Sequence, residues 1–522
     1  KNPKTKKGEF PRKSSGYSGA ARPRKRTGAD HFGLFTLFLL LAASLALYIR
    51  LMATGMLSNL YLIILMVVLI VLNAVSVIVQ LPLRRNKAGK LIMGIVSLLL
   101  SGAMLYGVVA VNSVQSALSK IVGKMTETEI TEVRVMNDNP ATSMGDTKGY
   151  TFGYIADADT KNTQSILDEI SKSFGTIKSK EYSSMTALAD ALYDDEVDAI
   201  LINQGYVDLL TEKDGYTDFR DQTRVLYTYT TTHEVDPIVP NTSITKEPFV
   251  VYCSGSDERD SDINAKTRSD VNILAVVNPK TRQILLINTP RDYYLPLAFN
   301  GEMDKLTHAG LYGIQESIAV LDNLYGTKTS YYGRVNFWGL IDIVDALGGI
   351  DVYSDYSFET SAGDVAGYGY RTYSYTEGWN HLDGLEALMF ARERHSFSDG
   401  DNQRGRNQMK VVQAIIEKIT SPSVLSNYQD LLKAMSDNCV TNISYDQITS
   451  LVQMMQKEGF SWNIQTMSAR EGSGDTYHYC SSAPGDPLYV MPPDYEYVNT
   501  IKSVVDQVMN GEEIVIPSEP TE

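Results

Sequence analysis

Hydrophobic residues are distributed in two different ways along this chain. In the first 113 residues they form three long runs without a charged residue, namely FGLFTLFLLLAASLALYI from residue 32, NLYLIILMVVLIVLNAVSVIVQ from 59 and LIMGIVSLLLSGAMLYGVVAV from 91. Each run is close to the roughly 20 residues that a helix needs to cross a bilayer. The pattern predicts three transmembrane helices within residues 33–113. It excludes a cleaved signal peptide, which would supply one short apolar segment.

Beyond residue 113 the apolar runs are short and alternate between strand-like and helix-like periodicity. Residues 114–245 carry strand patterns and two helix patterns without a cluster of catalytic residue types, which indicates a small accessory α/β domain. A proline-rich stretch reads as the linker to residues 246–511, where the same alternation is richer in reactive side chains. Alternation of this kind predicts an α/β fold with a sheet covered by helices. Residues 512–522 are predicted to form a disordered tail.

The charge distribution predicts the topology. Residues 1–32 hold ten Lys/Arg against Glu9 and Asp30 and almost no large apolar residue, as is typical of a disordered basic tail. The tail and the second basic loop, residues 81–90, are expected in the cytoplasm by the positive-inside rule. We therefore expect a multi-pass plasma-membrane protein whose residues 114–522 are extracellular.

The predicted extracellular part is strongly acidic. Of the 47 Lys/Arg and 62 Asp/Glu of the chain, 15 and 2 lie in residues 1–113, which leaves a net charge of −28 on the remainder. Such a surface binds nucleic acid poorly, so any anion must be bound by a local cluster of basic residues.

Three cysteines, Cys253, Cys439 and Cys480, are too few for a disulfide framework and have no metal-ligand spacing. Cys253 lies in an apolar run and is expected to be a core thiol. A bridge between Cys439 and Cys480 is an open alternative.

One basic cluster is predicted at the end of a hairpin. In RSDVNILAVVNPKTRQILLINTPRD, residues 278–281 form a turn between two apolar strands. With Asn278 opposite Thr281, antiparallel pairing places Asp270 opposite Thr289 and Arg268 opposite Arg291, so two arginines and an aspartate meet. The alternative interpretation is an ordinary surface ion pair.

A second cluster lies in ARERHSFSDGDNQRGRNQ, residues 391–408. A helix is predicted to end near Arg392, and Asp401 is placed to cap the next helix. Extending that helix's apolar row, residues 412, 415, 416 and 419, back by steps of four reaches Gln408 and Arg404. Arg406 falls on another face and is expected in solvent.

If the two clusters meet, positive charge is in excess. The set contains two aspartates, Asp270 and Asp401, and five arginines: Arg268, Arg291, Arg392, Arg394 and Arg404. A phosphate or pyrophosphate would balance the surplus, because guanidinium groups match its oxygens. The aspartates would then bind a divalent cation or act as a base.

In their order and spacing these motifs resemble the LytR-CpsA-Psr family of Gram-positive cell-envelope enzymes. The resemblance covers roughly residues 248–510 and is strongest in the two arginine segments and in GSDERD at 255, DKLTHAGLYG at 304 and LIDIVDALGGIDV at 340. Three spans and an accessory domain resemble the capsule-associated branch. The resemblance implies a mixed sheet covered by helices.

The resemblance also implies a function. Members of the family transfer a capsular or other anionic glycopolymer from a polyprenyl-pyrophosphate carrier to peptidoglycan, with Mg²⁺ or Mn²⁺ as cofactor. Metal-binding roles carry over to Asp270 and Asp401, which are implied to be catalytic together with Arg291 and Arg404. Pyrophosphate-binding roles carry over to Arg268, Arg291, Arg392, Arg394, Arg404 and Gln408.

The implied chemistry is attack of a sugar hydroxyl on the glycan-side phosphorus, with Asp270 and Asp401 as alternative bases. Asp257, Lys305 and His308 are secondary candidates with equally good structural interpretations. Two rival functions use the same residues differently: a hydrolase of the lipid pyrophosphate, and a non-catalytic regulator whose basic tail binds a partner.

Overall fold

The computed structural model describes residues 27–516, apart from gaps at 56, 81–86, 122–125, 156–159, 236–237, 239–242, 257–261, 361–362, 365–369, 399, 422–429, 432, 436–437 and 460. Most of the two predicted tails, and Asp257, lie outside the described residues. The chain divides into two compact units, residues 1–53 with 59–109 and residues 54–58 with 110–522.

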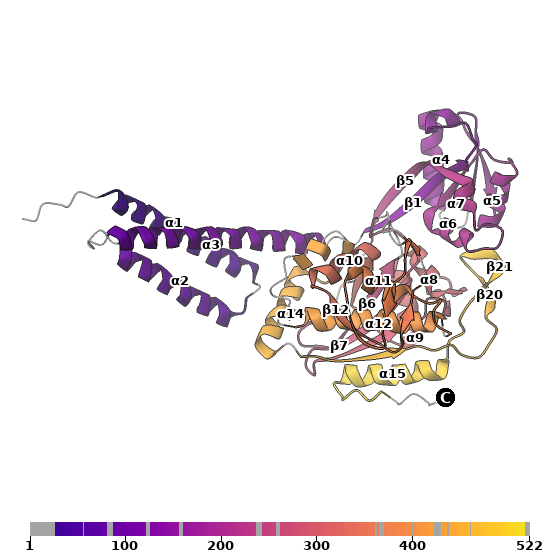
Figure 1. Ribbon diagram of the computed structural model, residues 1–522. Helices are drawn as coiled ribbons and strands as arrows, with labels where there is room; N and C mark the ends of the chain where they lie inside the picture. Colours follow the sequence, from indigo (N-terminus) through magenta and orange to yellow (C-terminus); the bar gives the residue numbers. More distant parts are fainter. Residues whose placement is uncertain are drawn as a thin grey trace, which may run out of the picture. The chain divides into compact units, whose positions relative to one another are not determined.

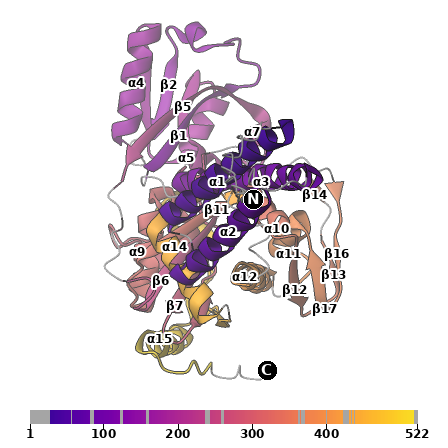
Figure 2. The same ribbon diagram turned by 90° about the vertical axis from the view of Figure 1, so that its left-hand side faces the viewer.

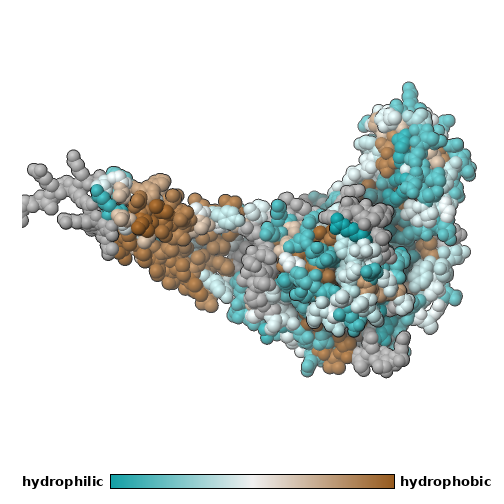
Figure 3. All heavy atoms as spheres, in the orientation of Figure 1, coloured by the Kyte–Doolittle hydropathy of each residue, from teal (hydrophilic) through white to brown (hydrophobic). Residues whose placement is uncertain are grey.

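The first unit is built from the three apolar runs, each of which forms a helix. These are α1 (Gly28–Thr54), α2 (Asn59–Gln80) and α3 (Lys87–Ile121), and all three are long and apolar enough to cross a membrane. Hydrophobic side chains cover their visible face (Figure 3). Their few polar groups bond between helices, as with Gln80 Nε2, which donates to Ser97 Oγ at 2.9 Å. Such pairing is expected where hydrocarbon offers no hydrogen bonds.

The accessory domain opens the second unit with a mixed sheet in the order β3-β2-β4-β1-β5. Its strands are β1 (Thr126–Met136), β2 (Thr151–Ile155), β3 (Lys178–Tyr182), β4 (Ala199–Asn203) and β5 (Thr223–Glu234). Its helices are η1 (Met144–Thr147), α4 (Thr160–Phe174), α5 (Met185–Tyr193), α6 (Gln204–Thr211) and α7 (Phe219–Gln222). Apolar residues of α4 cover one face of the sheet, and those of α5 and α6 cover the other.

The larger domain contains a six-stranded mixed sheet in the order β18-β11-β6-β7-β8-β19. Its strands are β6 (Phe249–Ser256), β7 (Val271–Asn278), β8 (Gln283–Asn288), β11 (Tyr331–Asn336), β18 (Cys439–Thr441) and β19 (Asn463–Ser468). β6, β7 and β8 are antiparallel neighbours, whereas β11 and β19 pair in parallel with β6 and β8.

Helices cover both faces of this sheet (Figures 1 and 2). Residues of α9 (Ile314–Tyr325) and α15 (Tyr495–Asn510) pack on one face, and those of α12 (Gly400–Ile419) and α14 (Tyr445–Glu458) on the other. Because both faces are buried, the central strands are apolar at almost every position and do not alternate. The predicted α/β architecture with a helix-covered mixed sheet is confirmed.

Shorter elements complete the domain. The helices are α8 (Leu306–Ala309), η2 (Gly310–Tyr312), α10 (Phe337–Ala346) and α11 (Gly384–Arg392). The two-stranded pairs are β9 (Tyr294–Pro296) with β10 (Met303–Lys305), β12 (Ile350–Ser354) with β17 (Gly378–Leu382), β13 (Phe358–Glu359) with β16 (Ser374–Tyr375), and β14 (Gly363–Asp364) with β15 (Tyr370–Arg371).

A C-terminal hairpin joins the two domains of the second unit. It consists of β20 (Tyr477–Cys480) and β21 (Ala483–Tyr489). Cys480, Ala483 and Val490 are buried in the same apolar cluster as α5 and α6. The accessory domain therefore shares part of its core with the larger domain. All three cysteines are free, so the Cys439–Cys480 bridge left open by the sequence is not formed.

Candidate active site

The β7–β8 hairpin has a different register from the predicted one. Asn278 pairs with Gln283, whereas the prediction placed Asn278 opposite Thr281. The connecting turn holds four residues, 279–282, so the pairing is displaced by two positions. A displacement by two keeps every side chain on its predicted face of the sheet.

This displacement changes the partners at the far end of the hairpin. The predicted pairings of Asp270 with Thr289 and of Arg268 with Arg291 are wrong; the observed register, continued past the strands, sets Asp270 opposite Arg291. Arg291 Nη1 lies 3.0 Å from Asp270 Oδ1, and Thr307 Oγ1 donates to the same oxygen at 3.4 Å. The hairpin thus forms a nearly buried ion pair.

Three arginines determine the ionisation of Asp270. Burial alone would raise the pKa of its carboxyl group, but the positive charges of Arg291, Arg268 and Arg404 outweigh burial and hold the pKa well below its usual range. These arginines come from the end of β8, the start of β7 and α12. Two segments more than a hundred residues apart in sequence therefore meet around one carboxylate.

Arg268 also contacts the accessory domain. Its Nη1 forms an ion pair with Glu212, the residue that ends α6. Gly310 packs against the backbone of residues 267–269, where a Cβ atom would come within 2.4 Å of the Thr267 carbonyl oxygen. The glycine of the HAGLYG segment thus permits α8 and η2 to lie directly against the segment before β7 that carries Arg268.

Close packing of α12 on the sheet brings Arg404 to the site. A Cβ atom on Gly405 would lie 2.4 Å from Asn288 Nδ2, at the end of β8. The predicted row is only partly correct, because Arg404, Gln408 and the apolar positions beyond them are half-buried. Helices or strands lie on two sides of α12, and its fully buried positions flank the predicted row on both sides: Gln403, Asn407, Val411 and Ala414 on one side, Gly405 and Met409 on the other. Arg406, expected in solvent, is half-buried and donates to Gln403 Oε1 at 2.8 Å.

The other predicted residues lie around the end of α11. The Arg392 guanidinium stacks on the Phe337 ring at 4.4 Å, and the exposed Arg394 donates to His395 Nε2 at 3.4 Å. Asp401 belongs to the first turn of α12, and its side chain lies outside what the structure describes. Arg268, Arg291 and Arg404 therefore lie close enough to Asp270 to lower its pKa, whereas the contacts described for Arg392 and Arg394 are with Phe337 and His395.

Asp292 is a site residue that the sequence interpretation missed. Lys305 Nζ lies 3.1 Å from Asp292 Oδ1, and Arg291 Nε lies 3.6 Å from Oδ2. Burial would raise the pKa of Asp292, but Lys305, Arg291 and Arg404 lower it. Asp292 follows Arg291 directly in the segment TPRD. An acidic residue beside a candidate arginine was the sequence signal that could have identified it.

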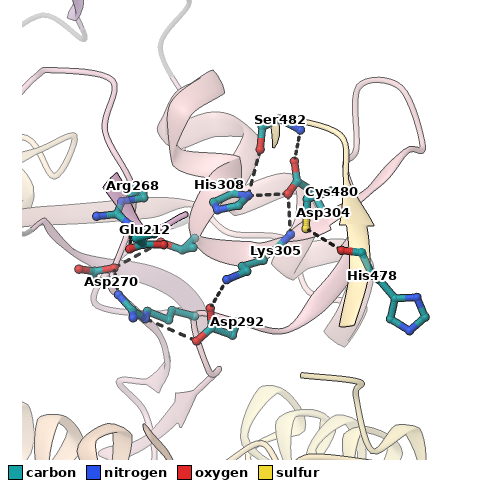
Figure 4. A network of polar contacts seen from close by, with 12 residues as sticks. Glu212, Arg268, Asp270, Asp292, Asp304, Lys305, His308, His478, Cys480 and Ser482 are labelled. Atoms are coloured by element: carbon teal, nitrogen blue, oxygen red, sulfur yellow. Dashed lines mark hydrogen bonds and ion pairs between the residues drawn. The ribbon is translucent and has the colours of Figure 1, made fainter. Parts of the chain in front are cut away.

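The network continues to a buried group at the other end of α8 (Figure 4). His308 Nδ1 lies 2.6 Å from Asp304 Oδ1 and 2.9 Å from Ser482 Oγ. Asp304, His308 and Cys480 offer three ligand atoms within 4.8 Å of one another. Burial, with the nearby Asp304, raises the pKa of the Cys480 thiol to about 12, so the thiolate that a metal requires is disfavoured. We interpret the group as a hydrogen-bonded support.

Asp270 is better suited to a divalent cation. Its carboxyl group is held ionised, and both hydrogen bonds that the described residues make to it end on Oδ1. Oxygen Oδ2 therefore accepts no hydrogen bond from the described residues. A hard cation prefers a carboxylate oxygen of this kind as its ligand. The donor set is compatible with Mg²⁺ or Mn²⁺.

Residues 216–482 match the model of the LytR_cpsA_psr family. The chain belongs to this family. The match includes every arginine and aspartate described around the site and residues 216–245 of the accessory domain.

Two relatives are similar over the same region. A polyisoprenyl-teichoic acid–peptidoglycan teichoic acid transferase TagU of Enterococcus faecalis is 34% identical over 207 residues, which are 40% of this chain and 65% of that protein. The protein of the same name from Bacillus licheniformis is 33% identical over 236 residues, 45% of this chain and 72% of the relative. The crystal structure of B. subtilis TagV superposes with a TM-score of 0.42 at 25% identity, covering 51% of this chain and 98% of that structure.

Proposed function

We propose that this protein is a membrane-anchored phosphotransferase that moves a glycopolymer from a polyprenyl-pyrophosphate carrier to peptidoglycan. The observation that carries the proposal is the convergence of Arg268, Arg291 and Arg404 on the single carboxylate of Asp270. The excess positive charge suits a dianionic or trianionic group, and forked guanidinium donors suit phosphate oxygens. The names of both relatives describe the same class of transfer.

The chain's own residues would act mainly by positioning. Arg291 is fixed by Asp270 and Asp292, so its guanidinium is oriented before the ligand arrives. With Arg268 and Arg404 it would hold the pyrophosphate and offset the charge that develops on the bridging oxygen. Arg392, Arg394 and Gln408, on and after α11, would extend this contact along the carrier's phosphates.

A bound Mg²⁺ or Mn²⁺ would supply Lewis-acid stabilisation of the phosphate oxygens. Asp270 would hold it, and Asp401 remains a proposed second ligand. The acceptor hydroxyl must lose its proton, and either aspartate is a candidate to receive it. Asp270 is a weak base at neutral pH because its pKa is lowered, which favours Asp401 as the base.

The three apolar helices would hold the enzyme at the bilayer that contains its lipid-linked donor. The basic tail and loop support an extracellular position of the catalytic domain, where the acceptor polymer would lie. The accessory domain supports assignment to the capsule-associated branch of the family. The proposed substrate is therefore a capsular polymer.

The direct test is product analysis by mass spectrometry. The full chain in nanodiscs is incubated with a short polyprenyl-pyrophosphate-linked saccharide and Mg²⁺, with and without peptidoglycan fragments. We expect a saccharide-phosphate adduct on the fragments and a roughly 100-fold slower reaction in Arg291→Lys, because lysine loses the forked contact. The matched control is Arg282→Lys, at the opposite end of the same hairpin.

Free saccharide phosphate without an adduct, at equal rates with and without fragments, would instead establish the rival hydrolase. Equal inactivity of the wild type and both variants would contradict an enzymatic function and favour a regulator.

A further inference from the structure

A cleft of about 450 Å³ lies between the two domains of the second unit, and no step of the proposed reaction uses it. The accessory domain lines one wall with Ser184, Met185 and Tyr206. The larger domain lines the other with the following residues: Phe299, Asn300, Glu302, Tyr312, Ser481 and Ser482. The volume lies within the range of ligand-binding pockets.

Two short helices connect this cleft to the arginine cluster. In α8, Thr307 donates to Asp270 while the adjacent His308 contacts Ser482 in the cleft wall. In α6, Tyr206 lines the cleft. Glu212, the residue that ends this helix, pairs with Arg268, and six helical residues span only about 9 Å. The cleft and the arginines therefore lie on opposite sides of the same two elements.

The lining combines one exposed aromatic ring with short polar side chains. Phe299 is 58% exposed, and its ring lies 4.8 Å from that of the half-buried Tyr312. Ser482 is buried, whereas the half-buried hydroxyls of Ser184 and Ser481 retain hydrogen-bonding capacity, and Asn300 adds an amide. An aromatic platform bordered by hydroxyl, amide and carboxylate groups suits a sugar ring, which has apolar C–H faces and a polar rim.

The charge of the lining narrows the class of sugar. Glu302 is the charged residue of the lining, and the predicted extracellular part carries a net charge of −28. A polyanionic chain would be repelled by this cleft, whereas a neutral oligosaccharide would not. The shared core of the β20–β21 hairpin with α5 and α6 fixes the two walls relative to one another. Less conformational freedom is then lost on binding.

We propose that the cleft between the accessory and catalytic domains is a binding site for a neutral oligosaccharide, the acceptor strand of the transfer reaction. This inference extends the proposed function. The role of the oligosaccharide as the acceptor rests on that proposed function. The site presents a strand beside the arginine cluster, separated from it by α6 and α8. Phe299 is the stacking platform, and Asn300 and the serines bind the sugar's polar rim.

The test is isothermal titration calorimetry on the full chain in nanodiscs. The probes are a β-1,4-linked N-acetylglucosamine oligomer, as the neutral chain, and a glycerol-phosphate oligomer of equal length, as the polyanion. We expect the neutral oligomer to bind and Phe299→Ala to weaken it at least about tenfold, because aromatic stacking is lost. Asn300→Asp, which removes the amide donor and leaves the aromatic pair intact, should weaken it as well. Tyr495→Ala removes a similarly exposed ring outside the cleft and should bind like the wild type.

Each outcome bears on one proposal. Absence of binding by the wild type, equal binding by Phe299→Ala, or tighter binding of the polyanion overturns the cleft assignment. Retained oligosaccharide binding in Arg291→Lys supports two separate sites. If the oligosaccharide binds through Phe299 but no adduct forms in the transfer assay, the cleft assignment stands and the transferase proposal fails.

Discussion

Asp270 determines the electrostatics of the site at the scale of single residues. One carboxylate faces Arg268, Arg291 and Arg404, and burial, which by itself opposes its charge, is outweighed by them. Removing the carboxylate would leave mutually repelling guanidinium groups in a nearly enclosed position. This excess of positive charge destabilises the protein without a bound ligand, and a bound pyrophosphate would neutralise it.

The ionisation of Asp270 predicts a pH dependence of stability. Its folded pKa is lowered, so its ionised form stabilises the fold above its ordinary pKa of about 4, and this contribution declines as the pH falls below that value. Asp270→Asn should destabilise the chain by about 3 kcal/mol at pH 7. The difference from wild type should narrow by about 1.4 kcal/mol per pH unit below pH 4.

Urea unfolding of both proteins in detergent at pH 7, 5 and 3 measures this difference. Asp506→Asn, an exposed carboxylate on α15, is the control and should stay within about 0.5 kcal/mol of wild type. A difference that is constant or widens toward pH 3 would show that Asp270 is not held ionised by the arginines.

At the scale of elements, the sequence predicted which segments meet but not their register. The apolar runs and the Asn-Pro turn were sufficient to predict the β7–β8 hairpin. The length of the turn could not be predicted from the sequence. Its fourth residue, Arg282, has a left-handed φ of 55°, which a non-glycine residue rarely adopts. For α12, the predicted row lies between two fully buried rows and is itself half-buried. Periodicity identifies an apolar face, whereas the packed neighbours on two sides decide which row is fully enclosed.

The contact of Gly310, at the start of η2, with residues 267–269 before β7 predicts an effect of a small substitution. Gly310→Ala would place a methyl group 2.4 Å from the Thr267 carbonyl oxygen and 3.0 Å from the Ser269 amide nitrogen. Backbone must therefore move, and we expect about 1–3 kcal/mol of destabilisation together with slower transfer, since Arg268 lies in the displaced segment. Gly333→Ala, where a Cβ atom meets nothing within 4 Å, is the matched control. Chemical unfolding and the transfer assay measure both effects; wild-type behaviour of Gly310→Ala would contradict the packing.

At the scale of the whole molecule, the accessory domain is part of the site. Its Glu212 pairs with Arg268, and its Glu127 accepts from the Ile314 amide at the start of α9. Such contacts join residues far apart in sequence, so no local pattern predicted them. The sequence located the arginines by motif and periodicity, but the cleft between the domains depends on tertiary packing alone.

The proposed topology predicts the accessibility of introduced cysteines in intact cells. Trp379→Cys, at a position that is 70% exposed in the catalytic domain, should react with a membrane-impermeant maleimide. Lys87→Cys, at the first residue of α3, should react only after the membrane is permeabilised. The wild type provides the background from its three native cysteines. The reverse pattern of labelling would contradict an extracellular catalytic domain.

The central claim is that the arginines around Asp270 recognise a pyrophosphate on a lipid. The measurement that tests it most directly is the affinity of the full chain in nanodiscs for a polyprenyl pyrophosphate and for the matching monophosphate, with wild type and Arg291→Lys. We predict that the wild type binds the pyrophosphate at least about tenfold more tightly and that the variant loses most of this preference. Equal affinity of the wild type for both lipids, or an unchanged preference in Arg291→Lys, would contradict the account.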